Sequence, residues 1–221
     1  MSMKICPSLL SANICNLEKD LRILEDNNIE VLHIDIMDGN FVPNIAFGIY
    51  QVEGLRKLNE MEFDVHLMVE NPDLFVEPLV EAGADSLTVH FEASKHLYKT
   101  IRYIKSFGIK AGVALNPSTP ISLLEHILPM LNRVLIMSVE PGFGGQEFIP
   151  FSLDKIRALD KIKKENGYDF DIQVDGGINI KNINDVVNAG VNEVVIGSSL
   201  FKGSIEENIK NFKSSLEPMY I

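Results

Sequence analysis

The feature that most limits the possible folds is a regular alternation of short apolar runs with longer amphipathic segments along the 221 residues. The short runs are rich in β-branched residues, as the buried strands of parallel sheets are. The longer segments carry apolar residues three or four positions apart, which is the spacing of a helix that covers a sheet. Gly83, Gly108 and Gly190 precede strands, at a position where helices commonly end. The pattern predicts repeated strand–helix units.

Eight short runs are expected to form strands: Lys4–Ser8, Val31–Asp35, Phe63–Met68, Ser86–His90, Lys110–Leu115, Arg133–Ser138, Asp171–Asp175 and Glu193–Ile196. Helices are expected within Leu17–Leu24, Leu74–Glu81, Leu97–Phe107, Ile156–Lys163 and Ile205–Leu216. Eight units close a (β/α)8 barrel, a fold of typically about 250 residues. A doubly wound sheet is the rival, but no nucleotide-binding glycine fingerprint follows the first strand. We predict an α/β fold, a single (β/α)8 TIM barrel with eight parallel strands, as one domain over residues 1–221.

Composition excludes several classes of partner. The formal net charge of −11 argues against nucleic acid and against an anionic membrane surface. The only two cysteines, Cys6 and Cys15, indicate a reducing compartment rather than a disulfide framework. No apolar run approaches the about 20 residues that span a bilayer, and the segment Met1–Ser8 shows no leader pattern. We expect a soluble, cytoplasmic protein.

Four residues with metal-binding side chains fall in or at the ends of predicted strands. His33 and Asp35 alternate on the second strand and therefore share a face, while His66 lies on the third and Asp175 ends the seventh. An ionised aspartate in an apolar strand needs a compensating partner. A mixed set of imidazole and carboxylate ligands suits zinc, iron(II), cobalt or manganese. The alternative for a lone histidine is a hydrogen-bonded core residue, and His90, His96 and His126 are left out of the predicted site.

Three turns rich in small residues follow predicted strands near the end of the chain. They are Gly142–Gly145, Gly176-Gly177 and Gly197–Ser199. In a (β/α)8 barrel the loops after the last strands commonly bind phosphate through backbone N–H groups. Backbone donors would hold an anion despite the negative net charge, although such glycines also serve tight turns. The loop Pro141–Pro150 is longer than a minimal connection and is a candidate mobile lid. The loop Asn40–Asn44 is also long for the fold, and would either cover the site or pack against a neighbouring subunit.

Met37, Met68 and Met137 lie at the ends of three different strands. Methionine in a barrel usually fills irregular gaps in the core. Three methionines at one end of the barrel would alternatively form a water-excluding surface around an electron-rich intermediate.

The motifs that contain these residues resemble the ribulose-phosphate 3-epimerase family over essentially the whole chain. They are His33–Asn44, Asp64–Val69, Met137–Gln146, Val174–Ile178 and Gly197-Ser198, with Ser8 after the first strand. The resemblance implies a metal-dependent enzyme of the pentose phosphate pathway. Such an enzyme interconverts D-ribulose 5-phosphate and D-xylulose 5-phosphate by proton transfer at C3, through an enediolate that the metal ion stabilises.

The resemblance also implies a role for each matching residue. Asp35 and Asp175 would be the catalytic acid/base pair, because inverting a carbon next to a ketone needs a proton removed from one face and returned to the other. His33, Asp35, His66 and Asp175 would bind one divalent ion per subunit, with zinc expected and iron(II), cobalt or manganese as alternatives. The sugar phosphate would contact Ser8, His66, Gly142, Phe143, Gly144, Gly145, Asp175, Gly176, Gly177, Ile178, Gly197 and Ser198. A homo-oligomer is expected.

Three alternatives share parts of this pattern. A 3-epimerase acting on a ketohexose 6-phosphate such as allulose 6-phosphate would use the same catalytic residues in a longer pocket. A related phosphosugar decarboxylase or aldolase carries a lysine in an Asp-x-Lys-x-x-Asp arrangement, where this chain has Met37. A metal-stabilised barrel retained only for binding would keep the fold without the reaction.

Overall fold

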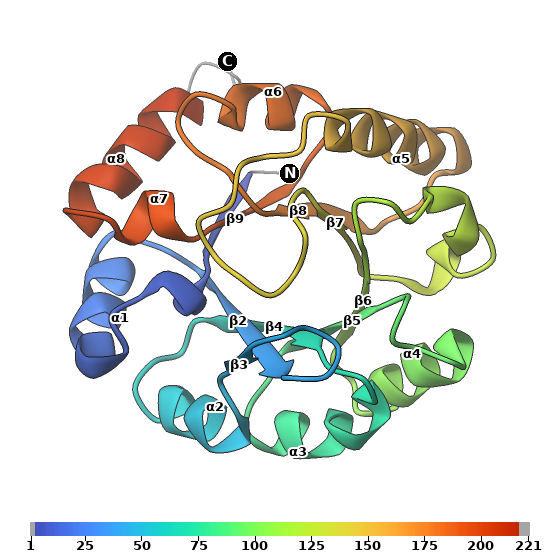
Figure 1. Ribbon diagram of the computed structural model, residues 1–221, viewed down its shortest axis with the longest axis horizontal. Coiled ribbons are helices and arrows are strands. Elements are labelled where there is room, and N and C mark those ends of the chain that lie inside the picture. Colours follow the sequence, from blue (N-terminus) through green and yellow to red (C-terminus); the bar gives the residue numbers. More distant parts are fainter. Residues whose placement is uncertain (1–2, 217–221) are drawn as a thin grey trace.

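A computed structural model describes residues 3–216 of the chain and shows a ring of strands surrounded by helices (Figure 1). The ends of the expected domain, residues 1–2 and 217–221, lie outside the described residues. The strands are β1 Lys4–Pro7, β2 Val31–Asp38, β3 Ile45–Ala46, β4 Glu62–Met68, β5 Ser86–His90, β6 Lys110–Leu115, β7 Arg133–Met137, β8 Asp171–Asp175 and β9 Glu193–Ile196. All eight predicted strands are present, within a few residues of their predicted bounds.

The eight long strands form one parallel sheet that closes on itself. Their order is β1-β9-β8-β7-β6-β5-β4-β2, with every neighbouring pair parallel. A parallel bridge between Ser8 and His33 joins the two ends of this order and completes the ring. The predicted (β/α)8 barrel is confirmed.

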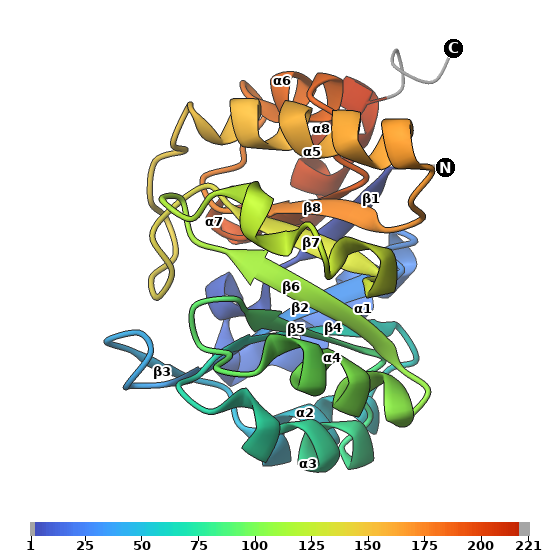
Figure 2. The same ribbon diagram turned by 90° about the vertical axis from the view of Figure 1, so that its right-hand side faces the viewer.

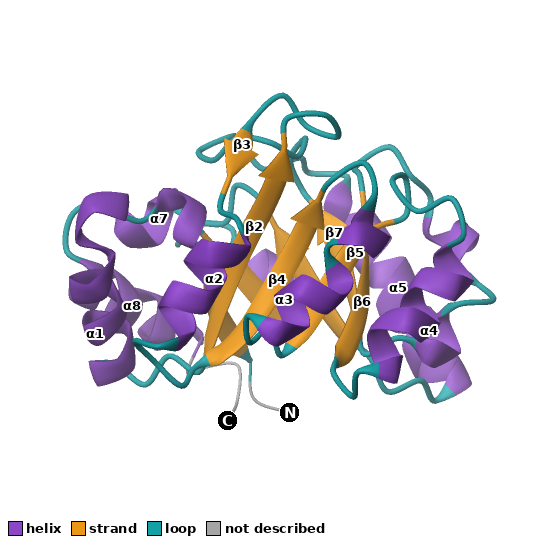
Figure 3. Ribbon diagram, turned by 90° about the horizontal axis from the view of Figure 1, so that it is seen from below, coloured by secondary structure: helices purple, strands orange, loops and turns teal. Residues whose placement is uncertain are grey.

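The ninth strand is an addition that the sequence did not predict. The two residues of β3 pair antiparallel with Met37 and Asp38 at the end of β2, which continues three residues past the predicted end at Asp35. Gly39 turns the chain with a positive φ of 74°. The resulting hairpin projects from one end of the barrel (Figures 2 and 3). A two-residue strand is too short to show any periodicity in the sequence.

Helices cover the outside of the ring. They are α1 Leu17–Asp26, α2 Ile49–Arg56, α3 Val76–Glu81, α4 Leu97–Ser106, α5 Ser152–Asn166, α6 Ile183–Asn188, α7 Ser198–Phe201 and α8 Ile205–Leu216. Leu74, predicted as helical, instead ends a separate 3₁₀ turn, Pro72–Leu74. Between β6 and β7 the chain forms two 3₁₀ turns, Ile121–Leu124 and Leu128–Met130. Pro120 and Pro129 lie at these turns, and proline prevents a continuous α-helix there.

The two faces of each strand meet different surroundings. On β2, Leu32, Ile34 and Ile36 belong to the large apolar cluster that also contains helix residues, whereas His33 and Asp35 face the barrel interior. The interior is unusually polar for a barrel of this kind. Arg133, at the start of β7, is 2% exposed and lies between the carboxylates of Asp64 on β4 and Glu193 on β9.

The C-terminal ends of the parallel strands meet at one end of the barrel, which we call the barrel mouth (Figure 3). The loop from β7 to α5 lies across this mouth in the view down the barrel (Figure 1). Among the described residues, no helix has the length and apolar character needed to span a bilayer.

Candidate active site

The structure brings the four predicted metal ligands together at the barrel mouth. His33 and Asp35 come from β2, His66 from β4 and Asp175 from the end of β8. The parallel register pairs Asp35 directly with His66, which explains why ligands from two strands lie side by side. One ligand atom of each residue lies within 4.8 Å of the others.

The separations between these atoms equal or slightly exceed those of ligands around one ion. Nε2 of His33 and Nδ1 of His66 lie 3.3 and 3.2 Å from Oδ1 of Asp35. The same two nitrogens lie 4.0 and 3.9 Å from Oδ2 of Asp175. Ligands of a tetrahedral zinc ion, bonded at about 2.0–2.1 Å, are about 3.3–3.4 Å apart. Only a small movement of Asp175 toward the histidines would close the set.

The hydrogen bonds of His33 leave its Nε2, the ring nitrogen that faces the ligand cluster, available to a metal ion. Its Nδ1 lies 2.8 Å from Oδ2 of Asp64, whereas its buried Nε2 has no hydrogen-bond partner among the described residues. A carboxylate on the outer nitrogen is the usual second partner of a metal-binding histidine. An unpaired buried nitrogen that faces two carboxylates fits a divalent cation. The residues therefore fit the metal ion that the sequence implies.

The two aspartates of the cluster have opposite electrostatic surroundings. Burial disfavours the ionised form of Asp35, but the positive charge of His33, whose Nε2 lies 3.3 Å from Oδ1 of Asp35, outweighs it and holds the pKa of Asp35 well below its usual range. Burial raises the pKa of Asp175 to about 7, and the negative charge of Asp35 adds to the shift. Without a metal ion, Asp35 is ionised near neutral pH while Asp175 holds a proton readily.

The raised pKa of Asp175 predicts how the metal-free protein responds to pH. The folded state binds the proton of Asp175 more tightly than the unfolded chain does. The contribution of Asp175 to the free energy of unfolding should therefore fall as pH rises from 3.8 to about 7. The Asp175→Asn variant should lose that part of the pH dependence and be the more stable of the two metal-free proteins above pH about 7, by about 1–4 kcal/mol. Urea unfolding of both chelated proteins across this range measures the difference. Parallel curves for the two proteins would contradict the prediction.

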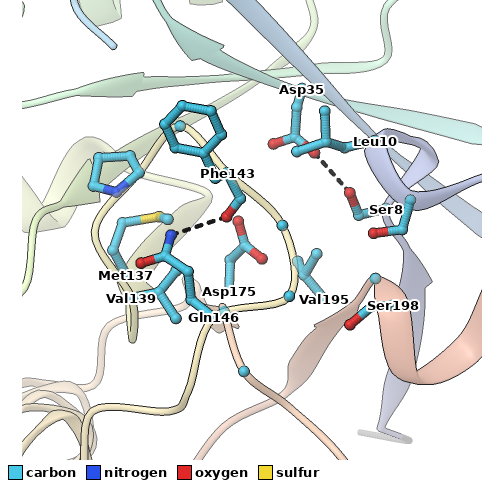
Figure 4. A pocket seen from close by; sticks show the side chains of 18 of the residues that line it. Ser8, Leu10, Asp35, Met137, Val139, Phe143, Gln146, Asp175, Val195 and Ser198 are labelled. Carbon is cyan, nitrogen blue, oxygen red and sulfur yellow. Dashed lines mark hydrogen bonds between the residues drawn. The ribbon is translucent and has the colours of Figure 1, made fainter. Parts of the chain in front are cut away.

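A pocket opens above the ligand cluster and is lined by every predicted substrate-binding residue except His66. Asp35 and Asp175 enter it from opposite sides, with Ser8 and Ser198 along one edge (Figure 4). His66 is fully buried and its ring lies behind Asp35, so the structure does not bring it to the pocket wall. His66 therefore belongs to the ligand cluster in this structure, and its contact with the sugar phosphate stays a prediction.

Ser8 has a second role that its sequence position did not reveal. Its hydroxyl donates a 2.7 Å hydrogen bond to Oδ2 of Asp35, on the oxygen that does not face the histidines (Figure 4). This bond fixes the orientation of the Asp35 carboxylate. It leaves Oδ1 directed toward the two histidine nitrogens.

Glycines at two of the predicted turns allow the chain to approach itself closely. Gly176 has a φ of +117°, and a Cβ there would lie 2.4 Å from the side chain of Val139. Gly177 has a φ of +67°, and a Cβ would lie 2.4 Å from the backbone nitrogen of Phe148. Any larger residue would displace the β7–α5 loop. These positions therefore hold the backbone of two turns together at the pocket wall.

Two polar residues that the sequence analysis did not single out tie the loops over the pocket. The side-chain amide of Gln146 donates to the carbonyl oxygens of Glu140 and Phe143, at 2.6 and 2.9 Å. The Asn44 amide donates to the carbonyl of Gly142 at 2.8 Å, which joins the β2–β3 loop to the β7–α5 loop. Both residues end a motif quoted above, but only the structure shows that they contact these carbonyls.

The three methionines, Met37, Met68 and Met137, all line the same pocket and are almost completely buried. Met37 and Met68 pack with Val42, and Met137 packs with Leu135 and Val139. They thus form an apolar part of the pocket wall close to the two aspartates.

Comparison with known proteins gives the family. The sequence profile described as the ribulose-phosphate 3 epimerase family matches residues 4–201. The chain belongs to this family. Two relatives are named ribulose-phosphate 3-epimerase: one from Synechocystis is 44% identical and covers 97% of this chain and 94% of its own, and one from Bacillus subtilis is 45% identical over 90% and 92%. The family inferred from the sequence motifs, and the class of epimerase with it, are confirmed.

Solved structures of low sequence identity share the fold of this epimerase family member. KGPDC from Streptococcus mutans superposes with a TM-score of 0.73 at 13% identity, covering both chains completely. A mutant tryptophan synthase α-subunit from Pyrococcus furiosus gives a TM-score of 0.70 at 19% identity, covering 100% of this chain and 98% of the other. At these identities the likeness concerns the barrel alone.

Proposed function

We propose that this chain is a ribulose-phosphate 3-epimerase that interconverts D-ribulose 5-phosphate and D-xylulose 5-phosphate by proton transfer at C3. The observation that carries the proposal is the position of Asp35 and Asp175. They come from β2 and β8 and face each other across one pocket (Figure 4). A carbon held between two carboxylates loses a proton to one and gains a proton from the other, which inverts its configuration.

The charge states of the two aspartates suit this exchange. Asp35 is held ionised and accepts a proton, whereas Asp175, with its raised pKa, supplies one. In the reverse direction the roles are exchanged. Ser8 keeps the Asp35 carboxylate aligned through its 2.7 Å hydrogen bond. Met37, Met68 and Met137 exclude water from one side of the reacting carbon.

His33, Asp35, His66 and Asp175 would hold a divalent metal ion, with zinc as the expected ion and iron(II), cobalt and manganese as alternatives. When bound, this ion supplies Lewis acidity that stabilises negative charge on the substrate oxygens. The outer nitrogen of His33 is fixed by Asp64, so that its ring is oriented before the ion arrives.

The substrate phosphate occupies the part of the pocket formed by the glycine turns. Gly142–Gly145, Gly176-Gly177 and Gly197-Ser198 bring backbone from three loops to the same wall. Backbone donors bind phosphate without requiring lysine. The Pro141–Pro150 loop, tied by Gln146, acts as the lid of this subsite. Fixing the phosphate positions C3 between Asp35 and Asp175.

Epimerisation of D-ribulose 5-phosphate by the purified protein tests this function. Incorporation of solvent deuterium at C3 separates an enzyme from a binding protein. Faster turnover of a ketohexose 6-phosphate would assign the longer substrate instead. Decarboxylation or carbon–carbon bond cleavage is not expected, because Met37 stands where the related decarboxylases carry lysine.

Removal of the metal ion is expected to abolish turnover and to leave the fold intact. The ligands come from three strands of a closed barrel, and an extensive apolar core holds these strands independently of the ion. Chelation followed by the epimerase assay and circular dichroism measures both properties, and re-addition of each candidate metal identifies those that restore activity. Full activity after exhaustive chelation would contradict the role of the ion.

We also propose one catalytic domain over residues 1–221, a cytoplasmic location and a homo-oligomer. Cys6 and Cys15 are both free, which supports a reducing compartment. Ile45 on β3 and Tyr50 on α2 are 79% and 85% exposed, and large exposed apolar side chains on neighbouring elements support a subunit contact there. Analytical ultracentrifugation of the protein measures its assembly state.

A further inference from the structure

We propose that Glu92 is a positioning residue of the metal centre, which acts through His90 to keep Nδ1 of His66 free of a proton and so available to the ion. The proposal rests on the metal site of the proposed function. It concerns two residues that lie outside the ligand cluster. Neither residue lines the pocket that contains Asp35 and Asp175.

A chain of hydrogen bonds connects His66 to Glu92. Nε2 of His66 lies 2.8 Å from Nε2 of His90, and Nδ1 of His90 lies 3.3 Å from Oε2 of Glu92. At the other end of the chain, Nδ1 of His66 faces Oδ1 of Asp35 at 3.2 Å. Both imidazoles are fully buried, and their rings stack with centroids 4.9 Å apart.

The carboxylate of Glu92 is fixed as an ionised acceptor. Its Oε1 accepts from the backbone N–H of Asn116 at 2.9 Å and from the hydroxyl of Thr119, which leaves Oε2 for His90. Burial opposes ionisation, but hydrogen bonds from His90, Thr119 and Asn116 outweigh it and lower the pKa of Glu92 to about 2. The ring of Phe41 packs on His90 with centroids 4.7 Å apart, which limits the access of water to this bond.

The positions of the ring protons determine which atom donates in each hydrogen bond between Glu92 and His66. His90 is fully buried against the ring of Phe41, surroundings that disfavour a charged imidazolium, so that His90 is neutral and carries one ring proton. Glu92 can only accept, and the proton of His90 therefore lies on Nδ1. Nε2 of His90 is then an acceptor, and the partner it requires is an N–H on Nε2 of His66. A neutral His66 with its proton on Nε2 has a bare Nδ1, which would face Oδ1 of Asp35 with a metal ion, rather than a proton, between the two acceptors.

The opposite arrangement is disfavoured by Glu92. If His66 carried its proton on Nδ1 and donated it to Asp35, its Nε2 would have to accept from His90. The bare Nδ1 of His90 would then face the Glu92 carboxylate, and two acceptors would meet in a partly buried site. Glu92 thus biases the tautomer of a residue that it does not touch.

The other histidine of the cluster has the same arrangement in a shorter form. Asp64 accepts directly from Nδ1 of His33, at 2.8 Å, and leaves Nε2 without a hydrogen-bond partner among the described residues, where it would be available to the ion. Each histidine is therefore backed by a carboxylate on the side away from the ion, one directly and one through a second imidazole. Such partners typically contribute a factor of about 10–100 to metal affinity.

The test compares the affinity of three proteins for Co²⁺, measured by visible absorption in competition with a chromophoric chelator. The Glu92→Gln variant should bind Co²⁺ about 10–100-fold more weakly than the unmodified protein, because an amide both donates and accepts and no longer selects a tautomer. Glu62→Gln is the matched control. Glu62 begins β4, and its side chain is 23% exposed, as is that of Glu92, but it pairs with Lys110. The Glu62→Gln variant should bind Co²⁺ with the affinity of the unmodified protein.

A double-mutant cycle shows whether Glu92 acts through His90. In a His90→Phe background the route to His66 is absent, and the Glu92→Gln substitution should then have no further effect on Co²⁺ affinity. Histidine ¹H–¹⁵N spectra of the zinc-loaded protein give a second readout. The proton of His90 should lie on Nδ1 in the unmodified protein and be shared between both nitrogens in the Glu92→Gln variant.

The outcomes separate this inference from the proposed function. Equal Co²⁺ affinities of Glu92→Gln and Glu62→Gln, or additive effects in the double-mutant cycle, would overturn the role of Glu92 and leave the metal centre standing. An unmodified protein that binds neither Co²⁺ nor zinc would overturn both.

Discussion

Replacing either Asp35 or Asp175 by Asn is expected to lower epimerisation by about 10²-fold or more, the scale at which a positioned acid or base contributes. Each substitution keeps the size of the side chain and removes the group that exchanges a proton with C3. Because the two carboxylates lie on opposite sides of the pocket, neither can take over the other's face of the substrate (Figure 4). The steady-state rate of conversion of D-ribulose 5-phosphate measures the loss.

Solvent isotope exchange shows whether the lower rate of each variant comes from the loss of one of two bases or from the loss of the metal ion. Each variant keeps one of the two bases and should still exchange the C3 proton of one epimer with deuterated solvent. The epimer that exchanges should be different for the two variants. Metal content must be measured in parallel, because both aspartates belong to the ligand cluster. Exchange of the same epimer by both variants, with metal retained, would contradict the two-base arrangement.

Asp171→Asn provides the control for these variants. Asp171 begins β8, the strand that Asp175 ends, and lies toward the opposite end of the barrel. The substitution is chemically the same and should leave turnover unchanged. Near-normal turnover in Asp35→Asn or Asp175→Asn would exclude that residue as an acid or base.

The barrel was predictable because its determinants are local and repeated. The bounds of β5, β6, β8 and β9 agree with those expected, since each strand is a short apolar run between turn residues. The hairpin with β3 was not predictable, because two residues carry no pattern. The 3₁₀ turns before β7 follow from prolines whose effect on a short amphipathic segment depends on the surrounding structure.

The ligand cluster was predictable for a related reason. His33, Asp35, His66 and Asp175 are polar residues on strands whose direction in a barrel is fixed, so their convergence follows from the fold. The role of His90 could not be derived in this way. Its sequence position places it near the barrel mouth, but only the coordinates show that its ring lies between His66 and Glu92.

The carboxylates of the barrel interior were also beyond the sequence analysis. Glu193 begins β9 and Asp64 lies early in β4, positions at which an apolar pattern alone suggests strand ends exposed to solvent. Both are almost completely buried. Their burial depends on Arg133, which reaches them from β7 across the barrel. Such a contact joins residues 60 or more positions apart and leaves no local signal in the sequence.

Replacing Arg133 by Met is expected to destabilise the protein by about 3–5 kcal/mol, because two buried carboxylates would lose their cation. The guanidinium of Arg133 donates to Asp64 at 2.5 Å, to Glu193 at 2.6 Å and to the hydroxyl of Ser86 at 2.9 Å. Gln173 also bonds both carboxylates, at 2.7 and 3.2 Å, but an amide does not neutralise their charge. In a chain of this size the loss corresponds to a fall in the unfolding temperature of about 6–20 °C.

Thermal unfolding of the metal-free protein measures this fall without the contribution of a bound ion. Arg157→Met is the matched control, because Arg157 pairs with Asp154 on the surface and both side chains are more than half exposed. An exposed pair of this kind contributes about 0–1 kcal/mol. Adding Glu193→Gln to Arg133→Met should recover part of the stability, since one of the two unpaired charges is removed. An equal fall in unfolding temperature for the two arginine variants would show that the buried cluster of Arg133, Asp64 and Glu193 contributes no more to stability than an exposed ion pair. The connection from Arg133 through Asp64 to His33 would then contribute nothing to the rigidity of the site.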